Sequence, residues 1–244
     1  MVREWIKKAP FPAIMSIISL AWFIVAYLLV TVRSIEPYYL EGLIFAIPFV
    51  LFAVTTFFTV KGKLKIGVSS IITGILIFVL GFVQLSAFAY ISFDAVTTAT
   101  TDTDKYQRIL KLTDYPNNPL TEEFPNKIPG NAKNVTFIYN PAFLQGSEIF
   151  GLKFQTDPDS IQNYINEFSE IARWIGDPED SEAEKNGIIS GPFDVLEYEN
   201  LPENFTIYLI DSKPYQLNDW NHGELSLVAI SKQRNEIIFL AEDW

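Results

Sequence analysis

The chain contains no cysteine and only one histidine, His222, among its 244 residues. The lack of cysteine excludes disulfide bonds, thiol catalysis and cysteine-ligated metal sites. A single histidine excludes a zinc centre built from several histidines. An exported domain of about 150 residues can nevertheless bury a core large enough to be stable without disulfides. The composition is therefore compatible with export and gives no sign of a metal or cofactor.

Formal charge is missing from three long stretches in the first third of the chain. Between Lys8 and Arg33 lie 24 uncharged residues, between Glu41 and Lys61 lie 19, and between Lys65 and Asp94 lie 28. A bilayer core about 30 Å thick needs roughly 20 apolar helical residues. We therefore predict three transmembrane helices, the first at about 11–32, the second at about 40–60 and the third starting near Gly67.

The short loops carry their Lys and Arg residues unevenly. Residues 1–8 contain three basic side chains and residues 61–65 contain three more, whereas the loop between the first two spans contains only Arg33. Basic loops are retained in the cytoplasm. This pattern predicts a multi-pass protein of the cell membrane whose N-terminus is cytoplasmic and whose C-terminal domain lies outside. The first apolar stretch exceeds a signal-peptide core and is read as a retained anchor.

The three uncharged stretches between Lys8 and Arg33, Glu41 and Lys61, and Lys65 and Asp94 contain no Asp, Glu, Lys, Arg or His, and Gln84 is their only strongly polar residue. Ionisable groups inside a membrane usually mark ion or proton pathways. Their absence argues against a transporter, a channel or an intramembrane enzyme, and favours an anchor. Pro48 in the second span is expected to kink that helix.

Three glycines, Gly67, Gly74 and Gly81, recur every seven residues in the third span. Seven residues are nearly two helical turns, so the glycines share one face and permit close approach of another helix. We expect this face to pack against the first or second span. Self-association with a second copy of the chain is the alternative.

The charge balance changes after the third span. Residues 1–91 hold seven Lys/Arg and three Glu, whereas residues 92–244 hold 11 Lys/Arg and 26 Asp/Glu. Nucleic acids and anionic lipids are bound by clustered basic residues, so the acidic region argues against both as partners. We divide the chain into an anchor (1–93), a threonine-rich linker (94–104) and an extracytoplasmic domain (105–244).

Apolar periodicity predicts the elements of the C-terminal domain. A short helix is expected at 104–113, an irregular proline-rich loop at 114–134, and a long helix that Asp157 caps and Gly176 ends. Strands are expected at 135–139, 148–155, 193–199, 205–211, 224–231 and 236–241. The last two form a hairpin through residues 232–235, and a β-bulge is possible near Gly151. The order ββαββββ predicts an α+β domain with a mainly antiparallel sheet, one face of which stays partly wet.

Several polar groups are candidates for chemistry, and each has a simpler interpretation. Five carboxylates at 177–184 could bind a hard cation, but they lack EF-hand spacing and resemble a solvated loop. His222 could act with Asp219 or Glu224 in acid–base catalysis, although Asn-His-Gly is also ordinary turn chemistry. The paired Asp157 and Asp159 suit helix capping. The remaining candidates are aromatic residues of a contact patch: Tyr215, Trp220 and Trp244.

No nucleophile elbow, phosphate-binding loop or metalloprotease motif occurs, so the sequence names no catalytic, cofactor-binding or metal-binding residue. The preferred hypothesis is a membrane-anchored binding module that contacts another protein of a bacterial envelope. A sensory or regulatory subunit, whose outer domain binds a small ligand or cation, is the alternative. A surface hydrolase that uses His222 is the third hypothesis.

Overall fold

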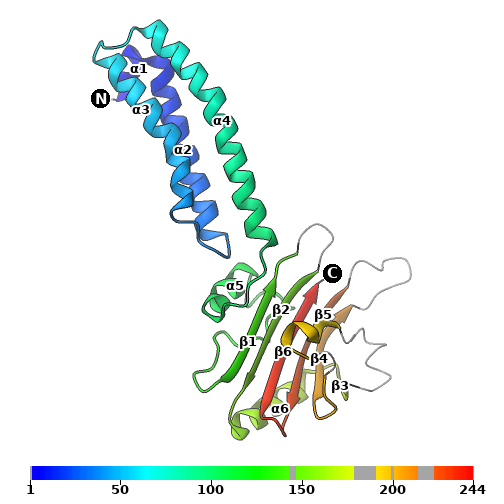
Figure 1. Ribbon diagram of the computed structural model, residues 1–244. Helices are drawn as coiled ribbons and strands as arrows, with labels where there is room; N and C mark the ends of the chain where they lie inside the picture. The colour runs from blue at the N-terminus through cyan, green and yellow to red at the C-terminus, as the bar shows by residue number, and fades with distance from the viewer. Residues whose placement is uncertain (1, 143–146, 179–190, 199–200, 214–222, 244) are drawn as a thin grey trace. The chain divides into compact units, whose positions relative to one another are not determined.

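The computed structural model describes residues 2–142, 147–178, 191–198, 201–213 and 223–243. The chain forms two compact units, Met1–Ala95 and Val96–Trp244 (Figure 1). The first consists of helices, and the second is built on an antiparallel sheet. The predicted fold class, a helical anchor followed by an α+β domain, is confirmed.

The first unit begins with the short helix α1 (Val2–Lys8) and the long helix α2 (Pro10–Val32). The 3-10 helix η1 (Glu41–Ala46) leads into α3 (Ile47–Val60), and α4 (Ile66–Thr97) completes the unit. Three segments of the described chain are long and apolar enough to cross a membrane: Pro10–Val32, Glu41–Val60 and Ile66–Ala95. Helix α4 extends into residues 94–97, which the sequence assigned to the linker.

The sequence suggested that Pro48 kinks a continuous helix, but the structure shows no continuous helix at this position. Pro48 occupies the first turn of α3, directly after the 3-10 helix η1. A proline is tolerated in a first turn because the N–H that it lacks has no partner within the helix there. The second span is therefore two helical segments, and the proline starts the second one.

The glycine stripe of α4 does not pack against the other two spans, so that prediction is wrong. Within the described residues, a Cβ atom built on Gly67, Gly74 or Gly81 has no atom within 4 Å. The buried positions of α4 lie on another face, which includes Ser69 and Thr73. The hydroxyls of these two residues bond to carbonyls of their own helix, which allows them to be buried. Self-association through the glycines stays a prediction.

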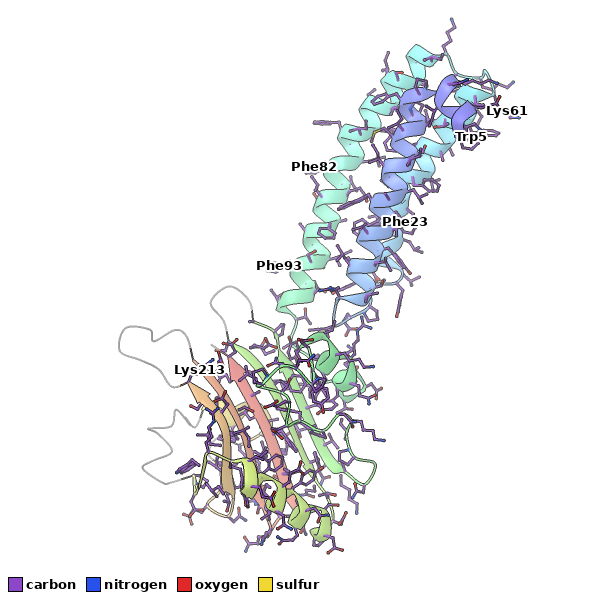
Figure 2. The ribbon with its side chains drawn as sticks, turned by 180° about the vertical axis from the view of Figure 1, so that it is seen from behind. Trp5, Phe23, Lys61, Phe82, Phe93 and Lys213 are labelled. Atoms are coloured by element: carbon purple, nitrogen blue, oxygen red, sulfur yellow. The ribbon has the colours of Figure 1, made fainter. Side chains whose placement is uncertain are left out.

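The surface of α4 that lies opposite the buried Ser69 and Thr73 is apolar and exposed. Phe78 and Phe82 are 82% and 74% exposed, and Phe82 projects from the outer side of the helix in Figure 2. A soluble protein rarely exposes large apolar side chains along a whole helix. Contact with water would make this exposure unfavourable, whereas a hydrocarbon environment would not, as expected of a membrane-spanning segment.

The second unit contains a six-stranded sheet in the order β1-β2-β6-β5-β4-β3, with every neighbouring pair antiparallel. Its strands are β1 (Lys133–Asn140), β2 (Glu148–Gln155), β3 (Trp174–Gly176), β4 (Thr206–Lys213), β5 (Glu224–Ser231) and β6 (Glu236–Asp243). Its helices are η2 (Thr103–Lys105), α5 (Tyr106–Leu112), α6 (Pro158–Ile171) and η3 (Gly191–Leu196). The predicted hairpin from β5 to β6 is confirmed, with Asn235 at φ 50° in its turn.

Helix α6 starts as predicted but ends earlier. Asp157 caps it and Pro158 occupies its first turn, whereas the expected end at Gly176 is wrong. Residues Trp174–Gly176 instead form the edge strand β3, which pairs with Ile207–Leu209 of β4. Trp174 and Ile175 favour extended structure, and pairing with a neighbouring strand outweighed the helical spacing of the apolar residues.

Aromatic side chains fill the space between one face of the sheet and the helices α5 and α6. Phe239 of β6 lies at the centre, with ring centroids of Phe154, Phe124 and Phe168 within 6.1 Å. Tyr106 of α5 packs edge-on against Phe137 of β1 at 5.5 Å. This dry layer anchors both helices.

The other face of the sheet is also covered, so the predicted wet face is wrong. A strand was expected at 193–199, but its described part begins within the 3-10 helix η3, whose Phe193 and Leu196 are buried in a core with Leu227 and Leu240. A Cβ on Gly151 would lie 3.0 Å from Ile138 Cγ2 and 3.1 Å from Leu196 Cδ2. The glycine thus permits a close approach, and β2 pairs with β6 without a bulge there.

Candidate functional site

Two of the acidic candidates lie at the start of α6: Asp157 is its N-cap and Asp159 lies in its first turn. Asp157 Oδ1 accepts a hydrogen bond from the Ser160 N–H at 2.8 Å, and its Oδ2 accepts from Ser160 Oγ at 2.8 Å and from Asn131 Nδ2 at 2.6 Å. These bonds, led by the Ser160 N–H, lower the pKa of Asp157 to about 2. The capping interpretation therefore accounts for Asp157.

Most of the other predicted site residues lie outside the described residues. They are His222, Asp219, the acidic residues 179–184 and the aromatic residues Tyr215, Trp220 and Trp244. Glu224, the second proposed partner of His222, is described. Its Oε2 accepts a hydrogen bond from Lys213 Nζ at 2.6 Å across β4 and β5.

Glu224 belongs to an acidic pocket at one end of the sheet that sequence analysis did not find. Glu148 of β2 pairs with Asp243 of β6, and Asp243 pairs with Glu224 of β5. Directly paired residues share a face, so the three carboxylates form one row across three adjacent strands. The row borders a pocket of about 230 Å³, which Glu242 also lines. We call this site the acidic pocket.

Burial and mutual repulsion shape the electrostatics of the acidic pocket. The pKa of Glu148 is raised mainly by burial, and Asp243 raises it further, although a hydrogen bond from Tyr139 opposes the shift. Burial also raises the pKa of Glu242. Ionisation of Glu148 and Glu242 is therefore less favourable than in water. A positively charged group in the pocket would favour their ionised forms.

The loop after α5 forms the facing wall of the pocket. Asn118 Oδ1 accepts from the Leu120 N–H at 3.0 Å, and the Leu120 carbonyl accepts from Ser226 Oγ of β5 at 3.0 Å. Thr121, in the same wall, is 3% exposed, and its Oγ1 has no hydrogen-bond partner among the described residues. A buried hydroxyl without a partner costs about 1–3 kcal/mol.

No group of three or more His, Cys, Asp or Glu side chains in the described segments is placed to hold a metal ion.

A second polar cluster lies on the opposite face of the sheet and serves the fold. Lys153 of β2 is 7% exposed, and its Nζ donates to the Leu196 carbonyl and to Glu197 Oε2, each at 2.7 Å. Tyr198 donates to Glu236 Oε1 at 2.5 Å, and burial followed by this contact raises the pKa of Tyr198 to about 12. Each of these groups has a protein partner, and together they hold the segment after η3 on the sheet.

The membrane-type unit carries an apolar groove of about 270 Å³ lined by residues of α2, α3 and α4. Its most polar lining residue is Gln84, which donates to the Ile44 carbonyl at 3.0 Å and accepts from Trp22 Nε1 at 3.2 Å. Those hydrogen bonds already use the amide, so the groove offers packing surface and little polar recognition.

Sequence reasoning missed the acidic pocket because its residues are scattered along the chain. Glu148 and Glu224 begin their strands and Asp243 ends its strand, so each resembled an ordinary charged residue beside a turn. A carboxylate at each of three strand ends was the available signal. The order β2-β6-β5 was needed to bring them together.

No protein-family model, curated protein or solved structure matches this chain. The candidate site therefore rests on its own geometry: three aligned carboxylates, a partly apolar pocket and one buried hydroxyl.

Proposed function

We propose that the chain is a membrane-anchored binding protein whose α+β unit faces the outside of the cell. The observation that carries this proposal is the acidic pocket, because it combines a cavity, a row of carboxylates and a raised pKa of Glu148 in one place. A cavity with polar groups of shifted pKa is a common mark of a binding site.

The helical unit supports the anchoring role. It offers three apolar segments long enough to span a bilayer, and their only charged residues, Glu41 and Asp94, lie at or next to the end of a segment. Six basic residues lie at 1–8 and 61–65 against one in the intervening loop, which favours a cytoplasmic N-terminus and an external C-terminal unit. In this arrangement the acidic unit stays in solution, repelled by anionic headgroups.

Topology and partner binding can be tested in the same cells. Alkaline phosphatase fused after Trp244 is expected to be active, because it folds only outside the cytoplasm, and a fluorescent protein exported unfolded through the same route is expected to be dark. Crosslinking in intact cells followed by purification of the tagged chain should recover a reproducible envelope protein. A bright cytoplasmic fluorescent fusion would contradict the topology, and failure to recover any partner across growth conditions would contradict the binding role.

A sensory or regulatory subunit is the second candidate. The observation in its favour is the unfavourable ionisation of Glu148, because a bound cation would change the stability of the outer unit. This version requires a signal to reach the helices. Hydrogen–deuterium exchange should then differ along α4 between the free protein and the crosslinked complex, whereas a simple tether predicts identical exchange there.

A further inference from the structure

Two basic segments that are far apart in the sequence meet at one end of the helical unit. The short helix α1 packs against both α2 and α3, and Figure 2 shows Trp5 of α1 at the same end as Lys61, which follows α3. Residues 1–8 and 61–65 contain a single carboxylate, that of Glu4, so this end carries an excess of positive charge. Its exposed lysines, which we call the basic collar, are Lys7, Lys8, Lys61, Lys63 and Lys65.

The contacts of the basic collar do not neutralise it. Within the described residues, no carboxylate forms an ion pair with any of the five lysines. Lys61 Nζ lies over the ring of Phe57, 5.7 Å from the ring centroid, and this contact leaves the ammonium group charged. Like charges gathered in one place repel one another, so an anion bound among them is favoured.

The basic collar has the depth of lipid headgroups in a bilayer that the helices span. Each of the three apolar segments has a collar lysine within two residues of its end on this side: Lys8, Lys61 and Lys65. The hydrocarbon core ends where these segments end, and the headgroup layer begins there. Trp5 is half-buried in α1, and tryptophan favours the same interface. The ammonium groups therefore lie at the level of the lipid phosphates.

The opposite end of the helical unit has the reverse charge. It carries one basic residue, Arg33, against the carboxylates of Glu36, Glu41 and Asp94. The Tyr38 hydroxyl donates to Asp94 Oδ2, which places the end of α4 beside the loop between α2 and η1. Anionic headgroups are therefore attracted at the basic collar and repelled at the other end.

We propose that the basic collar binds the anionic headgroups of phospholipids in the leaflet that surrounds it, in preference to zwitterionic headgroups. The inference rests on the anchoring part of the proposed function and names the lipid class that the anchor selects. A lysine ammonium group binds phosphate as a compact point charge, and several such groups beside a membrane helix attract anionic lipids. In a zwitterionic headgroup, the cation of the headgroup itself opposes this attraction.

Electron spin resonance of spin-labelled lipids tests the basic collar in phosphatidylcholine vesicles that contain the full-length protein. One sample holds a trace of spin-labelled phosphatidylglycerol, and the other holds a trace of spin-labelled phosphatidylcholine. The fraction of label immobilised against the protein gives the association constant of each lipid. At low salt, phosphatidylglycerol is expected to associate about twofold more strongly or better, because the lipids beside the collar gain the attraction. The preference should shrink in about 0.5 M NaCl, which screens the lysines.

Variants of the loop between α3 and α4 identify the residues responsible. The variant K61Q/K63Q/K65Q is expected to lose about half of the preference or more, because three collar charges are gone. The variant K61R/K63R/K65R keeps the charge and should keep the preference. Melting temperatures in detergent show whether each variant folds, and the salt dependence of the parent tests the same attraction without any substitution.

A matched control separates the basic collar from the charge of the whole protein. The variant K111Q/K127Q/K133Q removes three exposed lysines of the α+β unit and should keep the preference of the parent. Equal association of the two lipids with the parent, a preference that salt does not reduce, or full retention of the preference by K61Q/K63Q/K65Q would each overturn the proposal.

The outcome is separable from the tests of the proposed function. Both leaflets of the vesicles contain the labelled lipid, so the result does not depend on the direction in which the chain is inserted. A cytoplasmic C-terminal fusion in cells or the absence of a crosslinked partner would instead overturn the proposed function, so the two failures are distinguishable.

Discussion

Trp22 and Gln84 meet across 62 positions of sequence, with Trp22 Nε1 donating to Gln84 Oε1 at 3.2 Å. The same amide donates from Nε2 to the Ile44 carbonyl at 3.0 Å. One side chain of α4 therefore joins α2 and the 3-10 helix η1. The ring of Trp22 also packs against Phe45 and Phe88, at 6.2 and 5.6 Å between centroids.

The variant Q84L is expected to destabilise the helical unit by about 1 kcal/mol, since hydrogen bonds between helices in membranes are typically worth that much or less. The loss arises because Trp22 and the Ile44 carbonyl lose their partner. Thermal unfolding of the full chain in detergent measures it. Leu85, the next residue, is 68% exposed, so L85M should leave stability unchanged. Equal stability of Q84L and the parent would show that the contact contributes nothing.

The variant E148Q is expected to stabilise the protein at pH 7.5 and to have little effect at pH 4. Burial raises the pKa of Glu148 above its ordinary value of 4.5 in the folded state, so the native state binds more protons than the unfolded state between the two values. The free energy of unfolding therefore falls as pH rises through this window. Glutamine does not ionise, so E148Q avoids this decrease. Denaturant midpoints at the two pH values measure the effect. A lower midpoint for E148Q at pH 7.5 would contradict it.

The variant K153M is expected to cost about 1–3 kcal/mol, because it leaves the Leu196 carbonyl without the donor that lies 2.7 Å away. The methionine retains most of the apolar stem, so the change reports on the ammonium group. The matched variant E197Q should cost much less, since Glu197 is 72% exposed and water replaces the lost contact. Denaturant unfolding of both variants compares them, and the reverse order would refute the assignment.

The variant G151A is expected to destabilise the sheet by about 1–3 kcal/mol through overpacking. The new methyl group would meet Ile138 Cγ2 at 3.0 Å and both Leu196 methyl groups at 3.1 and 3.2 Å. G130A is the control, because a Cβ there has no atom within 4 Å in the described structure. The difference between the two melting temperatures is the measurement, and no difference would mean that the segment after η3 yields freely.

Sequence patterns predicted correctly those helix and strand boundaries that depend only on neighbouring residues. Asp157 and Pro158 located the start of α6 because capping involves neighbouring residues only. The end of α6 was misplaced because Trp174–Gly176 pairs with β4, whose position depends on residues more than 30 positions away. The 3-10 helix η3 replaced a predicted strand for a similar reason: Leu196 packs over Gly151 of another strand.

The candidate site was less predictable than the fold. The sequence directed attention to His222 and to the acidic residues 177–184, because charges close in sequence are easy to see. The acidic pocket instead unites Glu148, Glu224 and Asp243 through strand pairing. The hydroxyl of Thr121 lacks a hydrogen-bond partner among the described residues because of how the domain packs, and nothing in the sequence predicts this.

The amino-acid sequence by itself determined the division into apolar helices and an acidic α+β unit, because charge and periodicity act over short distances. Only the tertiary structure decided that the glycines of α4 stay open, that both faces of the sheet are covered, and that three strand ends make an acidic pocket. Each of these features depends on which segments distant in sequence become neighbours. Those contacts are set by the packing free energy of the whole fold and not by any local stretch of sequence.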